Sequence, residues 1–342
     1  MVILPDLPSG EQAWLRALEH LAGAGPAVLL PGSDEACEML AVHRARIPPA
    51  LLSFERPDGA HQRLMAKDSM YTLARNIGVP VPRTRAVATR AQLDAVLADL
   101  GLPCILKPTL GHLARARFGL RTTLVQHREE LVGLATPLLD GGLQVVLSEW
   151  IPGPDTALEG AIVVRTGKGD WPLVYGRRKL RQQPPATGNA SLLAGADVPG
   201  TVALAQRLLS AAGFIGIAAL ETKRHADTGE VMLIEVNVRV PQGFGLGDAC
   251  GADASWRTYA TLAGMKLPPQ PAARLDRKLL LPTLDARRLR TAFQRREIGL
   301  REVLRSYRGV RDVGFLDPRD PGPALMLARG RVRASARRLL RR

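Results

Sequence analysis

The sequence predicts a protein of mixed α/β and α+β class that is built from more than one lobe. The chain has 342 residues, which is more than one hydrophobic core usually accommodates. Its first part alternates helical and strand signals, whereas later apolar runs follow one another as antiparallel hairpins. We expect a short N-terminal βαβ lobe (residues 1–66), a central domain (residues 67–266) and a helical, basic C-terminal appendage (residues 267–342).

The N-terminal lobe is predicted from hydrophobic periodicity and from helix stop signals. An amphipathic segment ended by glycine predicts a helix over residues 11–25, and a second such segment predicts a helix over residues 34–47. Apolar runs at residues 27–32 and 50–54 predict two buried strands. Because no GxGxxG fingerprint follows the first strand, dinucleotide binding is only weakly indicated.

The central domain is expected to begin at Lys67 with a helix that stops at Gly78. Its other elements follow from apolar runs separated by glycine and proline. We expect helices at residues 91–103 and 200–213, strands at 103–108, 143–150, 216–223 and 231–242, and a hairpin at 157–179. The proline-rich segment near residue 267 then introduces arginine-dense helices.

Much of the net charge of +15 lies at the C-terminus. Residues 329–342 hold seven arginines and no acidic residue, and so supply +7 of it. Aromatic residues make up only 4% of the chain, and no spacing typical of nucleic-acid-binding motifs is present, so we expect no specific nucleic-acid partner. The tail is either a frayed, solvated terminus or a weak contact for an acidic partner or anionic membrane surface.

Composition predicts a cytoplasmic protein. No apolar run approaches 18 residues, so no transmembrane segment is expected, and the N-terminus lacks the pattern of a secretory signal. The three cysteines, Cys37, Cys104 and Cys250, have no CxxC spacing. Neither a disulfide framework nor a zinc site is therefore indicated.

Residues 231–242 carry the most informative pattern of the chain. In a strand, alternate side chains point to opposite faces, so Glu235, Asn237 and Arg239 share one face. The other, inward face would carry the apolar residues Met232, Ile234, Val236, Val238 and Val240. This arrangement is either the exposed face of an edge strand or a functional site, and we favour the site because asparagine is depleted in strands.

The preceding strand is expected to pair with this one through a short hairpin loop closed by Gly229. The pairing then sets Glu221 directly opposite Glu235, with Cβ atoms roughly 4.5–5.5 Å apart. Two carboxylates at that distance repel unless a positive group lies between them. Magnesium takes one or two protein carboxylates together with substrate phosphates, so we expect nucleotide-bound magnesium here.

Other motifs fit a triphosphate site. Lys107 ends a strand, where its ammonium can contact an α- or β-phosphate, although such a lysine is more often a solvated edge residue. Residues 109–123 hold two glycines and several basic side chains and suggest either a mobile phosphate flap or an ordinary hairpin. The backbone of Glu149, Trp150 and Ile151 would contact a purine edge, and Asp155 would accept from ribose hydroxyls unless it is only a turn residue.

A cluster of basic residues follows the expected hairpin of the central domain. It comprises Arg177, Arg178, Lys179 and Arg181. Such a cluster suits an anionic substrate or an acyl phosphate, but a run of charges is also typical of a solvated face.

Taken in order, Lys67, the ILKP strand, the EWIPGPD segment and the paired strands with LIEVNVR resemble the ATP-grasp superfamily, in particular its carboxylate–amine ligase branch. The resemblance covers roughly residues 1–265 and implies a nucleotide held between two α+β subdomains, with a flap subdomain at about residues 107–147. The most specific element is Glu221 with Glu235, Asn237 and Arg239. The flap departs from the pattern because it lacks a dense run of glycines, and the N-terminal lobe lacks a first βα unit.

The resemblance also implies residue roles. ATP and Mg²⁺ would be the cofactors, with Mn²⁺ as an alternative metal. The implied metal ligands are Glu221, Glu235 and Asn237; the nucleotide would contact Lys67, Lys107, Glu149, Trp150, Ile151 and Asp155. Arg239 would stabilise the transferring phosphoryl group, and Lys179 joins it as a candidate catalytic residue.

The implied reaction joins a small-molecule carboxylate, activated as an acyl phosphate, to an amine, with amide formation preferred over a thioester. The site has cations and metal ligands but no Ser-His-Asp arrangement, which suits a reaction catalysed mainly by positioning and electrostatics. The alternatives are an ATP-dependent phosphotransferase and a catalytically inactive nucleotide-binding regulator. The sequence does not identify the two substrates or the oligomeric state.

Overall fold

The computed structural model describes residues 7, 10–56, 58–109, 111–317 and 319–327. The arginine-rich tail at residues 329–342 lies outside these residues. Two sheets form the body of the molecule, a large one of seven strands and a small one of four, with a third, two-stranded sheet near the N-terminus. Over the described residues, no helix is long and apolar enough to cross a membrane. All three cysteines are buried free thiols.

The large sheet runs in the order β11-β10-β7-β8-β9-β12-β13. Its strands are β7 (Leu158–Arg165), β8 (Leu173–Gln183), β9 (Asn189–Gly195), β10 (Gly216–Arg224), β11 (Val231–Asn237), β12 (Lys278–Leu280) and β13 (Val310–Asp312). The predicted hairpins at residues 157–179 and 216–242 are both present as antiparallel pairs. Central strand β7 is buried on both faces, which explains the run of small and apolar residues at positions 160–164.

One face of the large sheet packs against α4 (Lys67–Asn76) and α8 (Pro199–Ala211). Helix α8 begins with a proline in its first turn, and Gly213 follows it with a φ of +63°, a left-handed conformation that glycine adopts without strain. Apolar residues of α4, α8 and strands β7, β10 and β11 form one continuous core between them. The cavity described below opens on the other face of the sheet.

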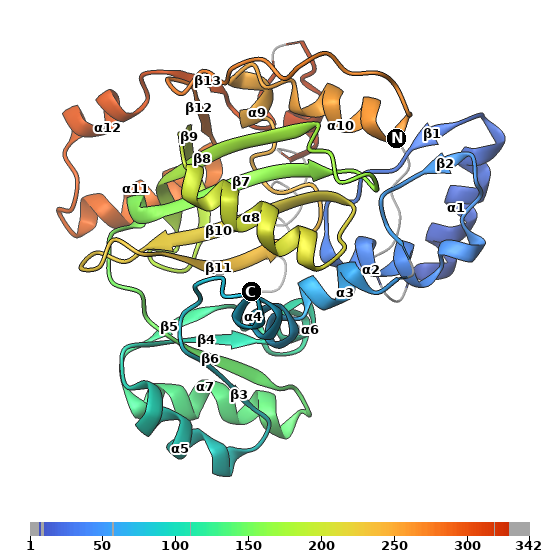
Figure 1. The fold of residues 1–342 in the computed structure, drawn as a ribbon. Helices are drawn as coiled ribbons and strands as arrows, with labels where there is room; N and C mark the ends of the chain where they lie inside the picture. The colour runs from blue at the N-terminus through green and yellow to red at the C-terminus, as the bar shows by residue number, and fades with distance from the viewer. Residues whose placement is uncertain (1–6, 8–9, 57, 110, 318, 328–342) are drawn as a thin grey trace, which may run out of the picture.

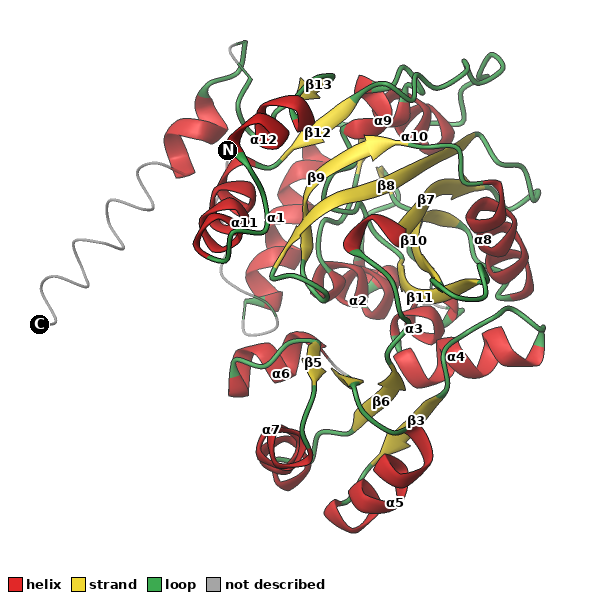
Figure 2. Cartoon of the chain, turned by 90° about the vertical axis from the view of Figure 1, so that its left-hand side faces the viewer, coloured by secondary structure: helices red, strands yellow, loops and turns green. Residues whose placement is uncertain are grey.

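The small sheet has the order β3-β6-β4-β5. Its strands are β3 (Thr84–Val87), β4 (Cys104–Pro108), β5 (Thr123–Val125) and β6 (Val145–Glu149), and its helices are α5 (Arg90–Leu100), α6 (Gly111–Phe118) and α7 (Arg128–Asp140). Thr89 and Gln92 form a capping box that starts α5. These elements share a separate apolar core, and Figure 2 shows them as a lobe below the large sheet.

The N-terminal lobe has the predicted βαβ arrangement. Helix α1 (Glu11–Gly23) precedes β1 (Ala27–Val28), and α2 (Asp34–Val42) connects β1 to its parallel partner β2 (Leu51–Leu52). Ser33 caps α2 by accepting a hydrogen bond from the backbone N–H of Ala36 at 3.2 Å. The short α3 (Ala60–Met65) then leads to α4, and Figure 1 shows the lobe to the right of the large sheet.

The C-terminal region differs from the prediction of a helical appendage. It holds the expected helices α11 (Pro282–Gln294) and α12 (Leu300–Ser306), preceded by α9 (Leu246–Ala249) and α10 (Ala254–Leu262). It also adds β12 and β13 to the large sheet, with β12 antiparallel to β9. These strands have three residues each, too few for their periodicity to stand out in the sequence. Residues beyond 267 thus complete the central sheet.

Candidate functional site

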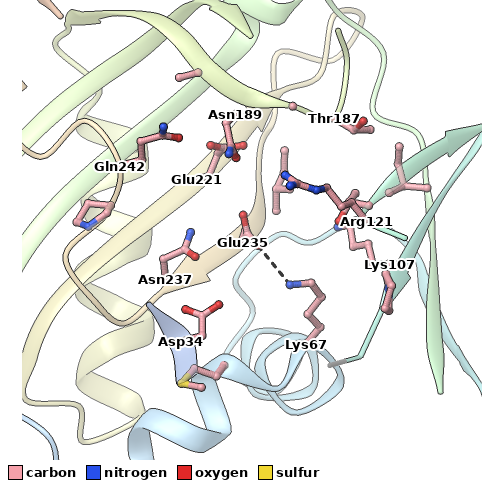
Figure 3. A pocket seen from close by; sticks show the side chains of 18 of the residues that line it. Asp34, Lys67, Lys107, Arg121, Thr187, Asn189, Glu221, Glu235, Asn237 and Gln242 are labelled. Atoms are coloured by element: carbon pink, nitrogen blue, oxygen red, sulfur yellow. Dashed lines mark hydrogen bonds and ion pairs between the residues drawn. The ribbon is translucent and has the colours of Figure 1, made fainter. Parts of the chain in front are cut away.

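The structure contains a cavity of about 1400 Å³ between the small lobe, the open face of the large sheet and the start of α2. Both lobes and the N-terminal region supply its lining. Figure 3 shows Glu221, Glu235 and Asn237 on one side of this space, facing Lys107 and Arg121 on the other. The cavity therefore brings oxygen ligands for a cation opposite basic groups that suit an anion.

Glu221 and Glu235 are directly opposite each other in the β10–β11 ladder, as predicted. The hairpin reaches this pairing by a different route, because Arg224 pairs with Val231 and a β-bulge follows between Glu221 and Thr222. The bulge leaves Ile234 as the extra residue of β11 and restores the expected partners at the glutamates. Gly229 has the predicted positive φ, +71°.

Because of the bulge, part of the predicted inward face of residues 231–242 is wrong. Leu233, not Met232 or Ile234, is the fully buried residue at the start of β11, because the extra residue reverses which side chains point inward. Val236 and Val238 are buried as expected. The strand also ends at Asn237, so the remaining residues of the predicted strand continue without ladder pairing.

Glu235 forms an ion pair with Lys67, the first residue of α4, at 3.3 Å between Oε1 and Nζ. Burial by itself would raise the pKa of Glu235, but the Lys67 and Lys107 ammonium groups together lower it to about 2. Burial likewise opposes the charged form of Lys67, yet Glu235 raises the pKa of this lysine above its usual value. Both groups are therefore charged at neutral pH.

Lys107 lies at the end of β4, where its side chain is only 5% exposed. Its Nζ donates to the hydroxyl of Tyr71 at 2.5 Å, and Tyr71 in turn donates to the bulge carbonyl of Ile234 at 2.6 Å. Burial, and secondarily the nearby Lys67 ammonium, lower the pKa of Lys107 to about 7. Tyr71 was not singled out from the sequence, because a tyrosine on an amphipathic helix looks like an ordinary core residue.

Lys179 and Arg239 contact the other proposed metal ligands. Nζ of Lys179 donates to Oε1 of Glu221 at 2.8 Å. Arg239 donates to Asp34 of α2 at 2.6 Å and to Oδ1 of Asn237 at 3.2 Å. Asp34 was not predicted as a site residue. The Ser-Asp start of a helix signals only a cap, and nothing local shows that it faces a strand about 200 residues away.

The predicted purine segment follows β6 and lines the cavity with Glu149, Trp150 and Ile151. The side chain of Glu149 is taken up by Arg83, at 2.7 Å from Nε to Oε2. Trp150 supports Lys223, whose Nζ lies 3.7 Å from the ring centroid. Burial lowers the pKa of Lys223 to about 8. Lys223, a cavity residue that the sequence did not single out, is thus a further buried cation on the open face of the sheet.

Asp155 does not belong to the residues that line the cavity. Its Oδ1 accepts from Nε2 of Gln182 at 2.7 Å and from the backbone N–H of Ala186 at 3.2 Å. The carboxylate therefore fixes the loop that connects β8 to β9. Thr187 and Asn189 at the end of that loop do line the cavity.

The residues of the basic cluster on β8 do not all face the cavity, because successive side chains of a strand point to opposite faces. Arg178 points to the face away from the cavity and pairs with the buried Glu159 at 3.2 Å. Arg181 forms a two-bond ion pair with Asp285 of α11. Only Arg177 and Lys179 of this cluster line the cavity, so an anion site there would use these two residues and not Arg178 or Arg181.

Residues 109–123 form neither of the loops considered from the sequence. They contain helix α6, which connects β4 to β5. Arg115 of this helix and Arg121 beyond it line the cavity. Two arginines of this segment thus reach the cavity from the small lobe, whereas Gly111 begins the helix and Gly119 follows it.

The donor set fits one type of metal. Among the residues that the structure describes, no three or more His, Cys, Asp or Glu groups gather as a metal site. Two opposed carboxylates with a neighbouring amide oxygen instead suit a magnesium ion that arrives with phosphate oxygens. In the structure the carboxylates are neutralised by Lys67 and Lys179, which agrees with a site built for positive charge.

The solved structures with similar folds share this architecture. PurK, an N5-carboxyaminoimidazole ribonucleotide synthetase in its ADP complex, matches with a TM-score of 0.61 at 18% identity, over 76% of this chain and 66% of that chain. The biotin carboxylase of Campylobacter jejuni matches with a TM-score of 0.62 at 16% identity, over 78% and 60%. The biotin carboxylase domain of Hydrogenobacter thermophilus 2-oxoglutarate carboxylase matches with a TM-score of 0.62 at 14% identity, over 81% and 62%.

These matches show that the chain has the same fold as these proteins, the ATP-grasp fold. No family model matches the sequence. Uncharacterized protein y4rH of Sinorhizobium fredii is 33% identical over 79 residues, which is 22% of this chain and 16% of that protein. The chain spans less than two thirds of the length of each of these proteins.

Proposed function

We propose that the chain is an ATP- and magnesium-dependent ligase that activates a carboxylate as an acyl phosphate and joins it to an amine. The observation that carries this proposal is the opposition of Glu221 and Glu235, with Lys67 and Lys179 neutralising them. Similar proteins have been solved in complex with ADP and with MgADP, which supports the proposed cofactors.

The nucleotide base would occupy the side of the cavity lined by Trp150 and Ile151, as those residues follow the small sheet directly. The phosphates would extend from there toward Lys67 and Lys107. Bound magnesium would neutralise charge on the phosphates, held by Glu221, Glu235 and Asn237. Lys67 and Lys179 would then release the glutamates and pair with phosphate oxygens instead.

In the first step, a substrate carboxylate oxygen attacks the γ-phosphorus and the bond to the β-phosphate oxygen breaks, which releases ADP. In the second step, the amine attacks the acyl carbon, loses a proton and displaces inorganic phosphate. Arg239 would stabilise the negative charge of the transferring group, and Asp34 holds its guanidinium in place. The chain itself contributes orientation and charge, which are the main requirements of phosphoryl transfer.

The proposal is tested by screening carboxylates and amines in pairs for ADP release in the presence of MgATP. A ligase releases ADP only when both partners are present, and mass spectrometry detects the new amide. A stable phosphorylated carboxylate would instead identify a phosphotransferase. Tight MgADP binding without turnover for any pair would identify a nucleotide-binding regulator.

A further inference from the structure

Arg177 differs from the other basic residues of its cluster in having no acidic partner among the residues that the structure describes. Arg178 pairs with Glu159, Lys179 with Glu221 and Arg181 with Asp285. Within the described part of the chain, no carboxylate oxygen lies within 4.0 Å of a nitrogen of Arg177. Its guanidinium donates instead to the backbone carbonyl of Gln242, at 3.0 Å from Nη1. The side chain is only 9% exposed, and it lines the cavity.

Strand pairing places Arg177 in one row with the proposed metal ligands. Arg177 of β8 pairs with Gly160 of β7, Gly160 pairs with Glu221 of β10, and Glu221 pairs with Glu235 of β11. Paired residues in an antiparallel sheet share a face, so the three charged side chains all point into the cavity. The row therefore runs from a cation, across a glycine, to the two carboxylates.

Gly160 makes room for the arginine in this row. A methyl group at Gly160 would lie 3.0 Å from Nε and 3.3 Å from Cγ of Arg177, and 3.1 Å from the carbonyl oxygen of Leu220. Nε and Cγ of Arg177 thus lie over the glycine, which leaves room for the guanidinium. The Gln242 carbonyl then fixes one end of it. This is a buried cation held in a defined orientation beside the metal end of the cavity.

The position of Arg177 favours a carboxylate over a nucleotide phosphate. In Figure 3, Gln242 lies on the side of Glu221 away from Lys107 and Arg121, which are the cations that face the proposed phosphate path. A planar guanidinium matches a carboxylate through two parallel hydrogen bonds. The remaining N–H groups of Arg177 are suited to that geometry, because among the described residues its side chain makes only one hydrogen bond.

We propose that Arg177, laid over Gly160, binds the carboxylate of the substrate next to the magnesium ligands. This assignment rests on the proposed function, which supplies the reaction that the bound carboxylate undergoes. It adds that the acceptor enters as an anion on the Gln242 side of Glu221. Arg177 then acts as a binding residue for the acceptor rather than for the nucleotide.

The test measures carboxylate binding by calorimetry in the presence of saturating MgADP, so it does not depend on turnover. The probes are bicarbonate, acetate and the L-amino acids. At least one of them should bind the wild-type protein, and Arg177→Gln should weaken that binding by about tenfold or more. Gly160→Ala should also weaken carboxylate binding. Arg177→Lys should bind the carboxylate more tightly than Arg177→Gln but less tightly than the wild type.

Arg178→Gln is the matched control, because this neighbouring arginine faces away from the cavity and Glu159 keeps its contact with Arg224. Its carboxylate affinity should equal that of the wild type, and the affinity for MgADP should be unchanged in all four variants. The inference is overturned if no probe binds, if Arg177→Gln binds it equally well, or if MgADP affinity falls to the same extent. Carboxylate binding without amide formation with any amine would reject the ligase and leave the Arg177 assignment in place.

Discussion

Glu235 is the residue on which the proposed metal site depends most directly. It faces Glu221 across the ladder and is held by Lys67. Replacing it with glutamine removes one of two carboxylate charges while keeping its size. We expect Glu235→Gln to lower kcat by about 10²-fold or more and to raise the magnesium concentration needed for half-maximal activity, because the transferring charge loses electrostatic support.

Steady-state assays across a magnesium titration measure both effects. Glu230→Gln is the control, because Glu230 lies on the same hairpin with an exposed side chain outside the cavity. Circular dichroism should show that both variants keep the wild-type fold. Near-normal activity of Glu235→Gln at low magnesium would reject the metal assignment.

We expect Lys107, as a proposed phosphate contact, to make nucleotide binding dependent on pH. Since burial lowers the pKa of this lysine to about 7, its charged fraction falls as the pH rises through neutrality. Phosphate binds the charged form better, so the Kd for MgADP should rise above about pH 7, by up to tenfold per pH unit. The rise ends at the higher pKa that Lys107 has in the complex.

Fluorescence or calorimetric titrations between about pH 6 and about pH 9 report this trend. Lys107→Met removes the titrating group and should give weaker binding with a flatter dependence on pH. If Lys107→Met retains the wild-type slope, another group is responsible and Lys107 does not contact the phosphates.

At the level of elements, α3 introduces a buried histidine between the N-terminal lobe and the large sheet. His61 is 2% exposed, packs against the ring of Phe214 at 4.7 Å between centroids, and has no hydrogen-bond partner for either ring nitrogen within the described structure. Burial, the dominant influence, lowers the pKa of His61 to about 4. The histidine is therefore neutral in the folded protein.

This burial predicts a loss of stability in mild acid. The unfolded chain protonates His61 near pH 6.5 and the folded chain only near pH 4. The titration of His61 therefore leaves the free energy of unfolding unchanged above pH 6.5. Below that pH the free energy of unfolding falls until the pH reaches about 4, by at most about 3 kcal/mol. Urea unfolding at several pH values measures it. His61→Phe should lose this part of the pH dependence; an unchanged pH profile in that variant would contradict the prediction.

The bulge in β11 shows how an element can reach a predicted result by an unpredicted path. Alternation alone assigns Glu235 and Asn237 to one face correctly, since both follow the bulge. It assigns Met232 and Ile234 wrongly, because Met232 precedes the bulge and Ile234 is its extra residue. A bulge depends on the twist of the neighbouring strands and on contacts such as the Tyr71 hydrogen bond to Ile234, which local sequence does not encode.

At the level of the whole molecule, the buried Arg181–Asp285 pair ties the C-terminal region to the large sheet. Asp285 accepts from both Nε and Nη2 of Arg181 at 2.8 Å, and also from Ser191 and Tyr307. Burial alone would raise the pKa of Asp285, but these donors lower it. The carboxylate is 1% exposed, so its removal leaves an unpaired buried cation.

Asp285→Ala should therefore destabilise the protein by about 3–5 kcal/mol. The double substitution Arg181→Met with Asp285→Leu removes both charges and should recover much of this loss. Guanidinium unfolding curves of the three proteins compare their stabilities. Equal destabilisation by the single and double variants would mean that packing, and not charge pairing, dominates at this contact.

The sequence by itself determined the ATP-grasp fold class, most helices and hairpins, and the opposition of Glu221 and Glu235. These features depend on short-range periodicity and on turns such as the one at Gly229. It also placed Lys67 and Lys107 at the ends of elements from which they reach the cavity.

Only the tertiary structure decided which charged groups face one another. Asp34 contacts Arg239, Lys223 lies over Trp150, and Asp155, which does not line the cavity, fixes the loop between β8 and β9. The tertiary structure also showed that β12 and β13 belong to the large sheet. The physical reason is range: periodicity assigns a side chain to a face of its own strand or helix, whereas the partner of that face comes from the packing of segments far apart in the chain.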